Sequence, residues 1–337
     1  MTAAGNFHKI LTMKAFITGG TGFIGSHLID HYLSSEKDIE IFALVRDLNN
    51  LKWLKGRNIN LLEGDLFSIP SLPSDIDYVF HLAGLTLASD LADYYTVNQR
   101  GTASLFRSLH SQKILPKKIV HLSSLSAAGP SSDCKPVKES SSPHPITPYG
   151  KSKLVGEVEA LKFKDLYSIV ILRATAIFGP RDTDFLNYFK FIKKGILPTI
   201  CFHKIIINFC YVKDLVRAID LSIQRELKSG EIINIANPRA YSWDDLGKAA
   251  GKAMGKSLKK LKIPFPSIYI IGIISEIMSI ITKKPSLLNR YKIKEMKERC
   301  WIADVKKAEE KLSFYPHYSL QDAVQETINW YFQQKWL

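Results

Sequence analysis

The stretch FITGGTGFIGSHLID, residues 16–30, connects a strand-like apolar run to a helix-like segment through a glycine-rich turn. Its glycines Gly19, Gly22 and Gly25 recur at every third position. Glycine permits a tight turn and lets the backbone approach a pyrophosphate without a Cβ in the way. The N-terminus of the following helix offers free N–H groups and a positive dipole end to the phosphates. The context of strand, turn and helix predicts a dinucleotide-binding unit, and a purely structural glycine turn is the alternative.

Strand-like and helix-like segments alternate through the first half of the chain. The expected strands are 14–18, 40–45, 59–62, 78–82, 118–122 and 168–172, and the expected helices include 22–33, 91–109 and 149–162. This alternation predicts an α/β fold with a doubly wound parallel sheet of the Rossmann type. Beyond about Gly179 the pattern changes to helices, such as 212–222 and 243–254, with short strands such as 231–235.

Three regions are expected from this change of pattern. Residues 1–12 read as a disordered extension that precedes the first strand. Residues 13–180 read as the dinucleotide-binding Rossmann domain, whose core also takes later elements. Residues 181–337 read as a smaller, mostly helical C-terminal lobe that binds the substrate.

The composition is that of an ordinary globular protein, with 46% hydrophobic and 23% charged residues among 337. The four cysteines, Cys134, Cys201, Cys210 and Cys300, form no Cys-x-x-Cys pair. Neither a metal site nor a disulfide framework is therefore indicated, and a reducing, cytoplasmic setting fits best. The first twelve residues lack the long apolar run of a secretory signal.

The end of the second expected strand bears on the choice of cofactor. Arg46 lies 21 residues after Gly25, and Asp47 follows it. An acidic residue near this point binds the adenosine ribose diol of NAD, whereas an arginine accommodates the 2′-phosphate of NADP. Arg46 therefore favours NADP as the cofactor, and Asp47 keeps NAD open.

A second pattern, from Tyr149 to Lys153 (YGKSK), stands where the third expected helix begins. Residues at i and i+4 share one face of a helix, about one turn apart. The ammonium favours the phenolate and lowers the pKa of the tyrosine, which makes it a usable proton donor and acceptor near neutral pH. A surface helix with a packed tyrosine and a solvated lysine is the alternative.

These motifs together resemble the extended short-chain dehydrogenase/reductase family, also called the NAD-dependent epimerase/dehydratase family. The resemblance covers residues 14 to about 330, nearly the whole chain. It rests on six segments in the family's order: TGGTGFIG (18–25), EGDL (63–66), FHLAGLT (80–86), NQRGT (98–102), HLSSLSAAG (121–129) and PYGKSK (148–153). Several motifs in the right order are more specific than any one alone.

The resemblance implies a role for each matched residue. Tyr149 is expected to be the general acid/base, and Ser124 is expected to hold the substrate oxygen. Lys153 is expected to depress the pKa of Tyr149 and to bind the nicotinamide ribose, while Asn98 takes the family's structural and proton-relay position. The residues expected to contact the cofactor are Gly19, Gly22, Phe23, Ile24, Gly25, Arg46, Asp65, Leu66, Leu82, Ala83, Gly84, Tyr149, Lys153 and Ala174.

Three departures from the family pattern bear on the substrate. Relatives that act on nucleotide sugars often carry an Arg-x-Phe-Asn pattern where this chain reads LRATAIFGPRD (172–182). They also often present an arginine where Ile207 and Asn208 stand here. The Asp-Glu pair that sugar 4,6-dehydratases use after the catalytic serine or threonine is replaced by Leu125 and Ser126.

These departures argue against the dehydratase reaction. They also make tight binding of a nucleotide diphosphate less expected. Segment 172–182 looks closer to the branch that contains dihydroflavonol reductases and 3β-hydroxysteroid dehydrogenases. We therefore expect NAD(P)-dependent hydride transfer at a secondary alcohol or ketone. A nucleotide-sugar 4-epimerase is the alternative, since Arg181 and its basic neighbours can serve a diphosphate, and a non-catalytic dinucleotide-binding protein is the second alternative. Ser123 and Ser126 stand close enough to Ser124 to be confused with it.

The segment FPSIYIIGIISEIMSIITKKP, residues 265–285, is almost wholly apolar from Ile268 to Ile281. The exceptions fall three or four apart and form one narrow polar stripe: Gly272, Ser275, Glu276 and Ser279. Residues 251–311 contain 15 Lys and Arg against 6 Asp and Glu, a net +9 of the chain's +14. An apolar face with basic flanks is typical of a helix in an anionic membrane interface, which would admit an apolar substrate. A helix packed inside the lobe as a roof of the substrate cleft is the alternative.

The partners expected from the sequence are a small molecule and, through residues 268–281, a peripheral membrane contact. Nucleic acid is not expected, because no nucleic-acid module is recognisable despite the positive charge. Residues 91–109 and 149–161 resemble the helices that family members pair into a four-helix bundle. A homodimer is therefore also expected.

Overall fold

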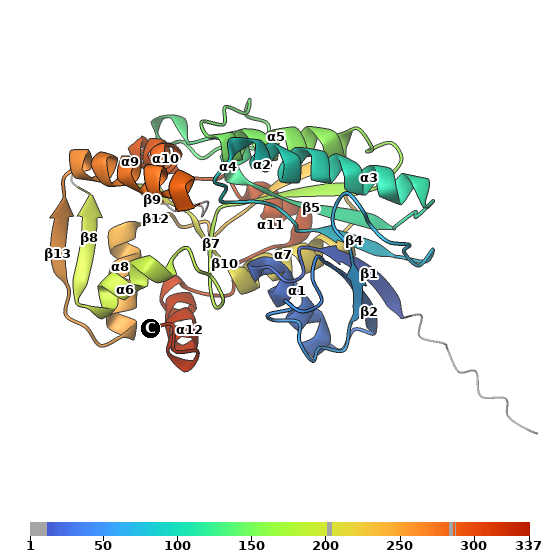
Figure 1. Ribbon diagram of the computed structural model, residues 1–337, viewed down its shortest axis with the longest axis horizontal. Coiled ribbons are helices and arrows are strands. Elements are labelled where there is room, and N and C mark those ends of the chain that lie inside the picture. Colours follow the sequence, from blue (N-terminus) through green and yellow to red (C-terminus); the bar gives the residue numbers. More distant parts are fainter. Residues whose placement is uncertain (1–11, 201–203, 283–285, 287) are drawn as a thin grey trace, which may run out of the picture.

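Seven parallel strands form the central sheet of the computed structural model, which describes residues 12–200, 204–282, 286 and 288–337. Their order is β11–β6–β5–β4–β1–β2–β3, so the sheet runs outward in both directions from β1 and β4 (Figure 1). The strands are β1 (Met13–Thr18), β2 (Ile39–Val45), β3 (Asn60–Glu63), β4 (Tyr78–His81), β5 (Lys118–Ser124), β6 (Ile169–Ala174) and β11 (Glu231–Ile235). This order confirms the predicted doubly wound sheet. Apart from Thr12, the predicted extension lies outside the described residues.

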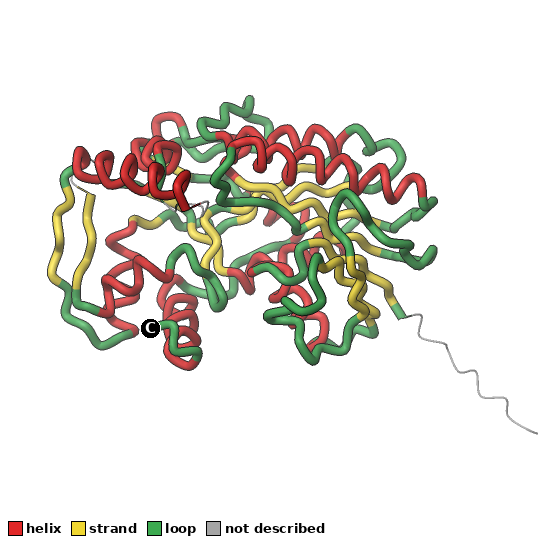
Figure 2. The backbone as a smooth tube through the Cα atoms, viewed as in Figure 1, coloured by secondary structure: helices red, strands yellow, loops and turns green. Residues whose placement is uncertain are grey.

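Helices cover both faces of the sheet (Figure 2). Alternate side chains of β1 point to opposite faces: Ala15 and Ile17 join one buried cluster, and Phe16 joins another. The first face is covered by α1 (Phe23–Ser34), α7 (Val212–Gln224) and α11 (Lys306–Leu312). The second is covered by α3 (Thr102–Ser111) and α5 (Pro148–Leu161). Apolar strands buried on both faces explain the continuous apolar runs in the sequence.

The expected helix over residues 91–109 is divided into three parts. It comprises α2 (Leu91–Tyr95), a π-helical turn (Thr96–Gly101) and α3. The wide turn places the buried Asn98 side chain between two neighbouring segments, where it bonds to Leu85 and Ser152. Such single π turns often occur at functional sites, and the periodicity of the sequence does not reveal this one.

The C-terminal lobe is built from three small sheets and several helices. The paired strands are β7 (Ala176–Phe178) with β10 (Phe209–Tyr211), β8 (Ile196–Ile200) with β13 (Lys259–Ile263), and β9 (Ile206–Ile207) with β12 (Tyr241–Ser242) and β14 (Cys300–Trp301). Its helices are α6 (Leu186–Lys193), α8 (Trp243–Ala253), α9 (Phe265–Thr282), α10 (Arg290–Lys297) and α12 (Leu320–Gln333). Stacked aromatic rings, among them Phe185 and Trp243, fill its core. In the described part of the chain, no helix has the length and apolar character needed to cross a membrane.

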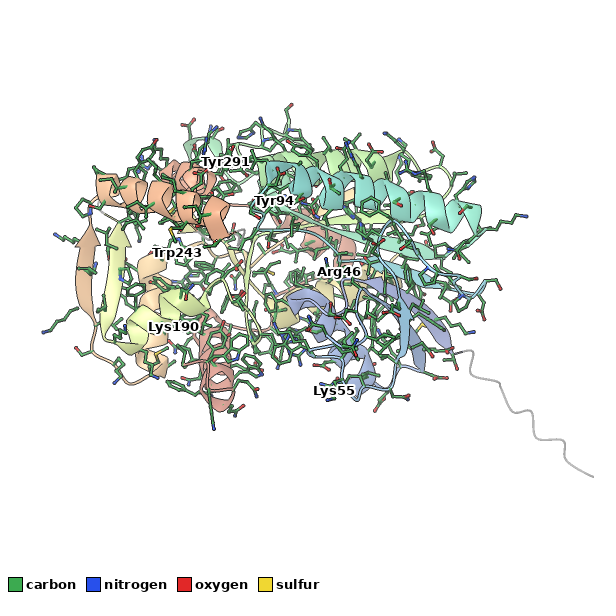
Figure 3. The ribbon with its side chains drawn as sticks, viewed as in Figure 1. Arg46, Lys55, Tyr94, Lys190, Trp243 and Tyr291 are labelled. Carbon is green, nitrogen blue, oxygen red and sulfur yellow. A yellow bond between two sulfur atoms is a disulfide. The ribbon has the colours of Figure 1, made fainter. Side chains whose placement is uncertain are left out.

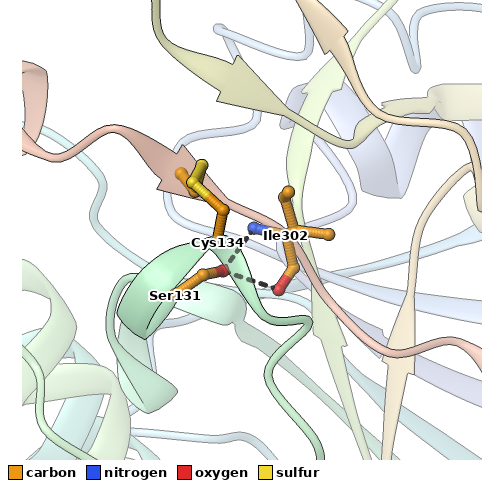
Figure 4. The surroundings of a disulfide bond; sticks show 4 residues. Ser131, Cys134 and Ile302 are labelled. Atoms are coloured by element: carbon orange, nitrogen blue, oxygen red, sulfur yellow. Dashed lines mark hydrogen bonds between the residues drawn. A yellow bond between two sulfur atoms is a disulfide. The ribbon is translucent and has the colours of Figure 1, made fainter.

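A disulfide joins Cys134 to Cys300, across 166 residues of sequence (Figure 4). Cys134 ends a short 3₁₀ turn (Ser132–Cys134) that follows α4 (Leu125–Ala128), and Cys300 begins β14. The hydroxyl of Ser131 donates to the carbonyl of Ile302 at 2.9 Å and accepts from its amide at 2.8 Å, which fastens the same two segments. The prediction that no disulfide is indicated is therefore wrong, and the argument for a reducing compartment loses its basis.

Candidate active site

The glycine turn lies between β1 and α1, as the sequence predicts. Gly19 has a φ of 77°, and a Cβ added there would lie 2.6 Å from the amide nitrogen of Ala83. A Cβ on Gly25 would collide with the carbonyl oxygen of Gly19. Helix α1 begins at Phe23 after Gly22, which provides no side-chain cap for the first amides. A close backbone approach and an uncapped helix N-terminus fit the pyrophosphate of a dinucleotide.

The other residues expected near the cofactor gather at the carboxyl ends of adjacent strands. Leu82, Ala83 and Gly84 follow β4, and Ala174 ends β6, while Ile24 lies in the first turn of α1. Open parallel sheets bind ligands in the crevice at these ends, where the strand order reverses. The structure therefore brings these predicted residues to one edge of the sheet.

Asp65 and Leu66 lie beyond β3, on the side expected for adenine. The Asp65 carboxylate accepts hydrogen bonds from the amides of Phe67 and Ser68 at 2.8 and 2.9 Å, which hold the pKa of that carboxyl below its usual value. The charge of Arg46, exposed just after β2, acts in the same direction. Leu66 is buried against Gly101. This arrangement keeps Asp65 ionised and fixed in place.

Asn98 connects the loop after β4 to helix α5. Its side-chain oxygen accepts from the Leu85 amide at 2.8 Å, and its nitrogen donates to the Leu85 carbonyl at 3.0 Å and to Ser152 Oγ at 2.9 Å. A Cβ added to Gly84 would lie 3.3 Å from Asn98 Oδ1 and 3.7 Å from Lys153 Nζ. The Asn98 side chain is thus fully used in holding the backbone that faces Lys153.

Tyr149, Ser124 and Lys153 come together at the end of β5. Helix α5 begins at Pro148, with Thr147 accepting from the Gly150 amide at 3.1 Å as its N-cap, so Tyr149 lies in the first turn. The Ser124 side chain lies beside the Tyr149 phenol and acts to lower its pKa. One turn further on, Lys153 Nζ donates to the Leu122 carbonyl at 2.7 Å. The three predicted side chains therefore form one cluster.

The structure also separates Ser124 from the serines beside it. Ser123 Oγ donates to a carboxylate oxygen of the buried Glu157 at 2.5 Å. Glu157 in turn receives Arg173 Nε at 2.9 Å and Nη2 at 2.6 Å, in a pair whose side chains are only 1% and 2% exposed. The Ser126 amide donates to Ser124 Oγ at 3.1 Å. Ser123 is thus committed to a buried network, whereas Ser124 faces Tyr149.

The depressed tyrosine pKa that the sequence predicts is not found. Burial raises the pKa of Tyr149 to about 12, against the lowering effect of the Ser124 side chain. Burial also lowers the pKa of Lys153 to about 8, although the Glu157 carboxylate opposes this shift. Loss of hydration therefore outweighs the attraction between phenolate and ammonium.

Two stacked histidines lie beneath this cluster. The rings of His81 and His121, from β4 and β5, have centroids 5.0 Å apart. His81 Nδ1 bonds to Thr18 Oγ1 at 2.8 Å, and Nε2 bonds to Thr102 Oγ1 at 2.9 Å. Complete burial, together with the charge of Lys153, lowers the pKa of His81 to about 3. The ring is therefore neutral in the folded protein.

We expect His81→Asn to reduce the loss of stability in acid. Because the unfolded chain protonates His81 near pH 6.5 and the folded chain near pH 3, the folded state binds fewer protons between these values. Stability contributed by the neutral ring is thus present above about pH 6.5 and declines, on the order of a few kcal/mol, toward pH 3. Urea unfolding at pH 7, 6 and 5 measures the unfolding free energy of the wild type and of His81→Asn. Equal slopes of unfolding free energy against pH in both proteins would contradict the prediction.

Residues that the sequence did not single out surround the open side of Tyr149. The Tyr94 ring, from α2, lies 6.1 Å from the Tyr149 ring. The carboxylates of Glu295 and Asp184 both act to raise the pKa of Tyr149. Lys292 Nζ donates to Glu295 at 3.0 Å, so α10 presents an ion pair to this side of the site.

A pocket of about 610 Å³ opens beside Tyr94, between α2, α9 and α10. Leu91 and Tyr94 line it from α2, Glu276 and Ser279 from α9, and Tyr291 from α10. Tyr94 and Tyr291 approach it from the two lobes (Figure 3). Tyr94 thus joins this pocket to Tyr149.

Arg181 and Asn208, which stand where relatives could bind a diphosphate, take part in other interactions. Arg181 pairs with Asp30 of α1 and lies over the Trp53 ring, 5.0 Å from its centroid. Asn208 is completely buried, donates to the Asn237 carbonyl at 2.8 Å and accepts from the Ala303 amide at 2.8 Å. Asn208 is thus held by the backbone on both sides, whereas Arg181 pairs through Nη2 and keeps Nε and Nη1 without a hydrogen-bond partner among the described residues.

Comparison with known proteins agrees with this geometry. The model of the NAD dependent epimerase/dehydratase family matches residues 15–236. The chain belongs to this family. Membership makes it an oxidoreductase that uses a nicotinamide dinucleotide and confirms the resemblance drawn from the motifs.

Relatives within the family differ in substrate. A ceramide reductase of Caulobacter vibrioides is 24% identical over 324 residues, 95% of each chain. An uncharacterized UDP-glucose epimerase of Bacillus subtilis is 27% identical over 341 residues, covering 94% of this chain and 97% of the other. The crystal structure of UDP-glucuronic acid 4-epimerase from Bacillus cereus with NAD is 25% identical, with a TM-score of 0.76 and coverage of 96% and 99%. Family membership therefore leaves the substrate open.

Proposed function

We propose that this family member is a reductase or dehydrogenase that acts at a ketone or secondary alcohol of an apolar substrate. The observation that carries the proposal is the placement of Ser124 beside the Tyr149 phenol, with Lys153 one helical turn away. Ser124 holds the substrate oxygen, and Tyr149 transfers the proton to or from it. A bound nicotinamide dinucleotide exchanges the hydride with the substrate carbon. Burial raises the pKa of Tyr149 to about 12, so the phenol is protonated near neutral pH and can supply the proton that ketone reduction requires.

Three further residues position these groups. Lys153 lies close to Gly84, and its ammonium would hold the ribose of a bound nicotinamide dinucleotide. Asn98 holds the Leu85 backbone and thereby keeps Gly84 in place. Gly19 and Gly25 allow the tight turn before the uncapped N-terminus of α1, where the pyrophosphate would bind. These contacts support catalysis through orientation rather than through direct chemistry.

The charges around the open side of Tyr149 support an apolar substrate over a nucleotide diphosphate. Asp184 and Glu295 both act on the phenol, and the Lys292 ammonium beside them is already paired with Glu295. Arg181 and Asn208 are committed to other partners. The ceramide reductase that matches along 95% of both chains acts, by its name, on a lipid.

A nucleotide-sugar 4-epimerase is the second candidate, favoured by the Bacillus cereus structure with UDP-glucuronic acid and NAD. An assay of cofactor oxidation separates the two, because a reductase consumes one reduced cofactor per product and a 4-epimerase returns its cofactor unchanged. We expect long-chain ketones to give stoichiometric oxidation of the reduced cofactor. UDP-sugars epimerised without net oxidation would replace this proposal, and cofactor binding without any hydride exchange would indicate a non-catalytic member.

We also propose that Arg46 gives the chain a preference for NADP(H) over NAD(H), although the neighbouring structures named above hold NAD. Arg46 is exposed at the carboxyl end of β2 (Figure 3). Loss of one charge-assisted contact to a phosphate costs about 1.5–3 kcal/mol. Arg46→Ala is expected to weaken NADP(H) binding by that amount in a calorimetric titration and to leave NAD(H) binding unchanged. Lys55→Ala removes a charge from another exposed residue of the same region as a control, and equal wild-type affinities for both cofactors would refute the preference.

The proposal includes a homodimer through α3 and α5. Val158 on α5 is 50% exposed, which leaves apolar surface for such a contact. Light scattering at micromolar concentration measures this assembly, and a monomeric mass would contradict it.

A further inference from the structure

Helix α9 is amphipathic with its polar side turned inward. Ser275 Oγ and Ser286 Oγ lie 2.5 Å apart, and Glu276 receives Arg290 Nε at 2.7 Å. At Gly272, a Cβ would collide with the Ile293 side chain of α10. The narrow polar stripe thus fastens α9 to α10. An amphipathic helix that packs inside a lobe instead turns its apolar side inward.

The outward side of α9 is apolar and exposed. Its side chains are between 41% and 69% exposed: Tyr269, Ile270, Ile271, Ile273, Ile274, Ile277, Met278 and Ile281. The alternative in which this helix packs its apolar side inside the lobe therefore does not describe the structure. A contiguous apolar surface of this size marks an interaction site rather than ordinary surface. We refer to these eight side chains as the α9 face.

Exposed lysines flank the α9 face on both sides along the chain. Strand β13, which leads into α9, exposes Lys259, Lys260 and Lys262, and α10 exposes Lys294 and Lys297. Lys297 Nζ lies 5.6 Å from the ring centroid of Phe265 at the start of α9. A second copy of the chain would bring the same lysines together, whereas an anionic lipid surface complements them. We propose that the α9 face docks on an anionic bilayer and lies in its interface.

Docking also explains how a lipid reaches Tyr149, a step that rests on the proposed function. Glu276 and Ser279 line the 610 Å³ pocket on the inner side of the helix whose outer side carries Ile273 and Ile277. Leu91 lines the same pocket and is 41% exposed at its edge. The pocket thus opens beside the bilayer contact. A lipid whose polar headgroup suits the mostly polar lining of this pocket would then reach Tyr94 and Tyr149 from the membrane.

Vesicle co-sedimentation tests the docking. The full chain is expected to sediment with vesicles of phosphatidylcholine and phosphatidylglycerol, less so as salt is added, and not with phosphatidylcholine alone. Ile273→Glu/Ile277→Glu is expected to lower the bound fraction at least about tenfold. Leu115→Glu/Leu166→Glu is the matched control, since it places two glutamates on leucines that are 75% and 58% exposed away from α9. This control is expected to bind like the wild type.

Two outcomes overturn the docking: a wild-type protein that stays in the supernatant at low salt, or equal losses in both double variants. Light scattering provides a further check, because a dimer that Ile273→Glu/Ile277→Glu converts to a monomer assigns the α9 face to a second copy instead. The same variant is expected to retain cofactor binding and reduction of a short, water-soluble ketone. If vesicle binding succeeds and every ketone is inert, the proposed function fails while the docking stands.

Discussion

Tyr149→Phe is expected to fold, bind the nicotinamide cofactor and lose turnover by about 10²–10⁴-fold. The phenylalanine ring fills the same space in the first turn of α5, but no hydroxyl remains to exchange a proton with the substrate oxygen. Ser124 still holds that oxygen as a hydrogen-bond donor, so substrate affinity changes less than the rate. Single-turnover measurements of cofactor oxidation, with cofactor affinity from a separate titration, give both quantities.

Tyr94→Phe is the matched control for this variant. The Tyr94 hydroxyl accepts from the Ala88 amide at 3.2 Å and lies in the same site, 6.1 Å away between ring centroids. Its loss removes a structural hydrogen bond but no proton donor, so turnover is expected to fall by less than about tenfold. Residual activity of Tyr149→Phe near the wild-type rate would show that another group protonates the substrate oxygen.

The sheet was predictable because its signals are local. Expected strand 14–18 is Met13–Thr18 in the structure, and expected strand 231–235 is Glu231–Ile235. Buried strands read as short apolar runs, and the glycine turn is required by backbone contacts that no side chain tolerates. The π-helical turn around Asn98 was not predictable, since a one-residue widening of a helix leaves the apolar period almost unchanged.

The site was predictable only where a motif marks it. Tyr149 and Lys153 were predictable together because they stand four positions apart on one helix, and Ser124 was predictable from its position in a motif. Lys292 and Glu295 reach the same site from α10, more than 130 residues along the chain, without any local pattern. Cys134 and Cys300 meet for the same kind of reason, across 166 residues.

The pKa values of Tyr149 and Lys153 required the structure. Sequence spacing reports that two charges are close, but burial decides how much each costs to ionise. Here burial raises the pKa of Tyr149 and lowers that of Lys153. The spacing of Tyr149 and Lys153 alone therefore predicts the wrong direction for the pKa shift of the tyrosine.

Glu157→Leu is expected to lower the free energy of unfolding by about 3–5 kcal/mol. The substitution leaves the Arg173 guanidinium, which is 2% exposed, without its carboxylate partner. It also removes the acceptor of the Ser123 hydroxyl, directly beside Ser124. Urea unfolding measures the loss. Cofactor affinity is expected to fall as well, because Arg173 precedes Ala174 at the end of β6.

Glu159→Leu in the same helix is the control, because its partner Lys162 is 58% exposed and such pairs contribute at most about 1 kcal/mol. Equal losses from Glu157→Leu and Glu159→Leu would show that the buried pair has no special weight. The double variant Glu157→Leu/Arg173→Met then identifies the cause. If the cost arises from an orphaned charge rather than from lost attraction, removing both charges restores most of the stability. A double variant as unstable as Glu157→Leu alone would instead mean that the Ser123 bond, and not Arg173, sets the cost.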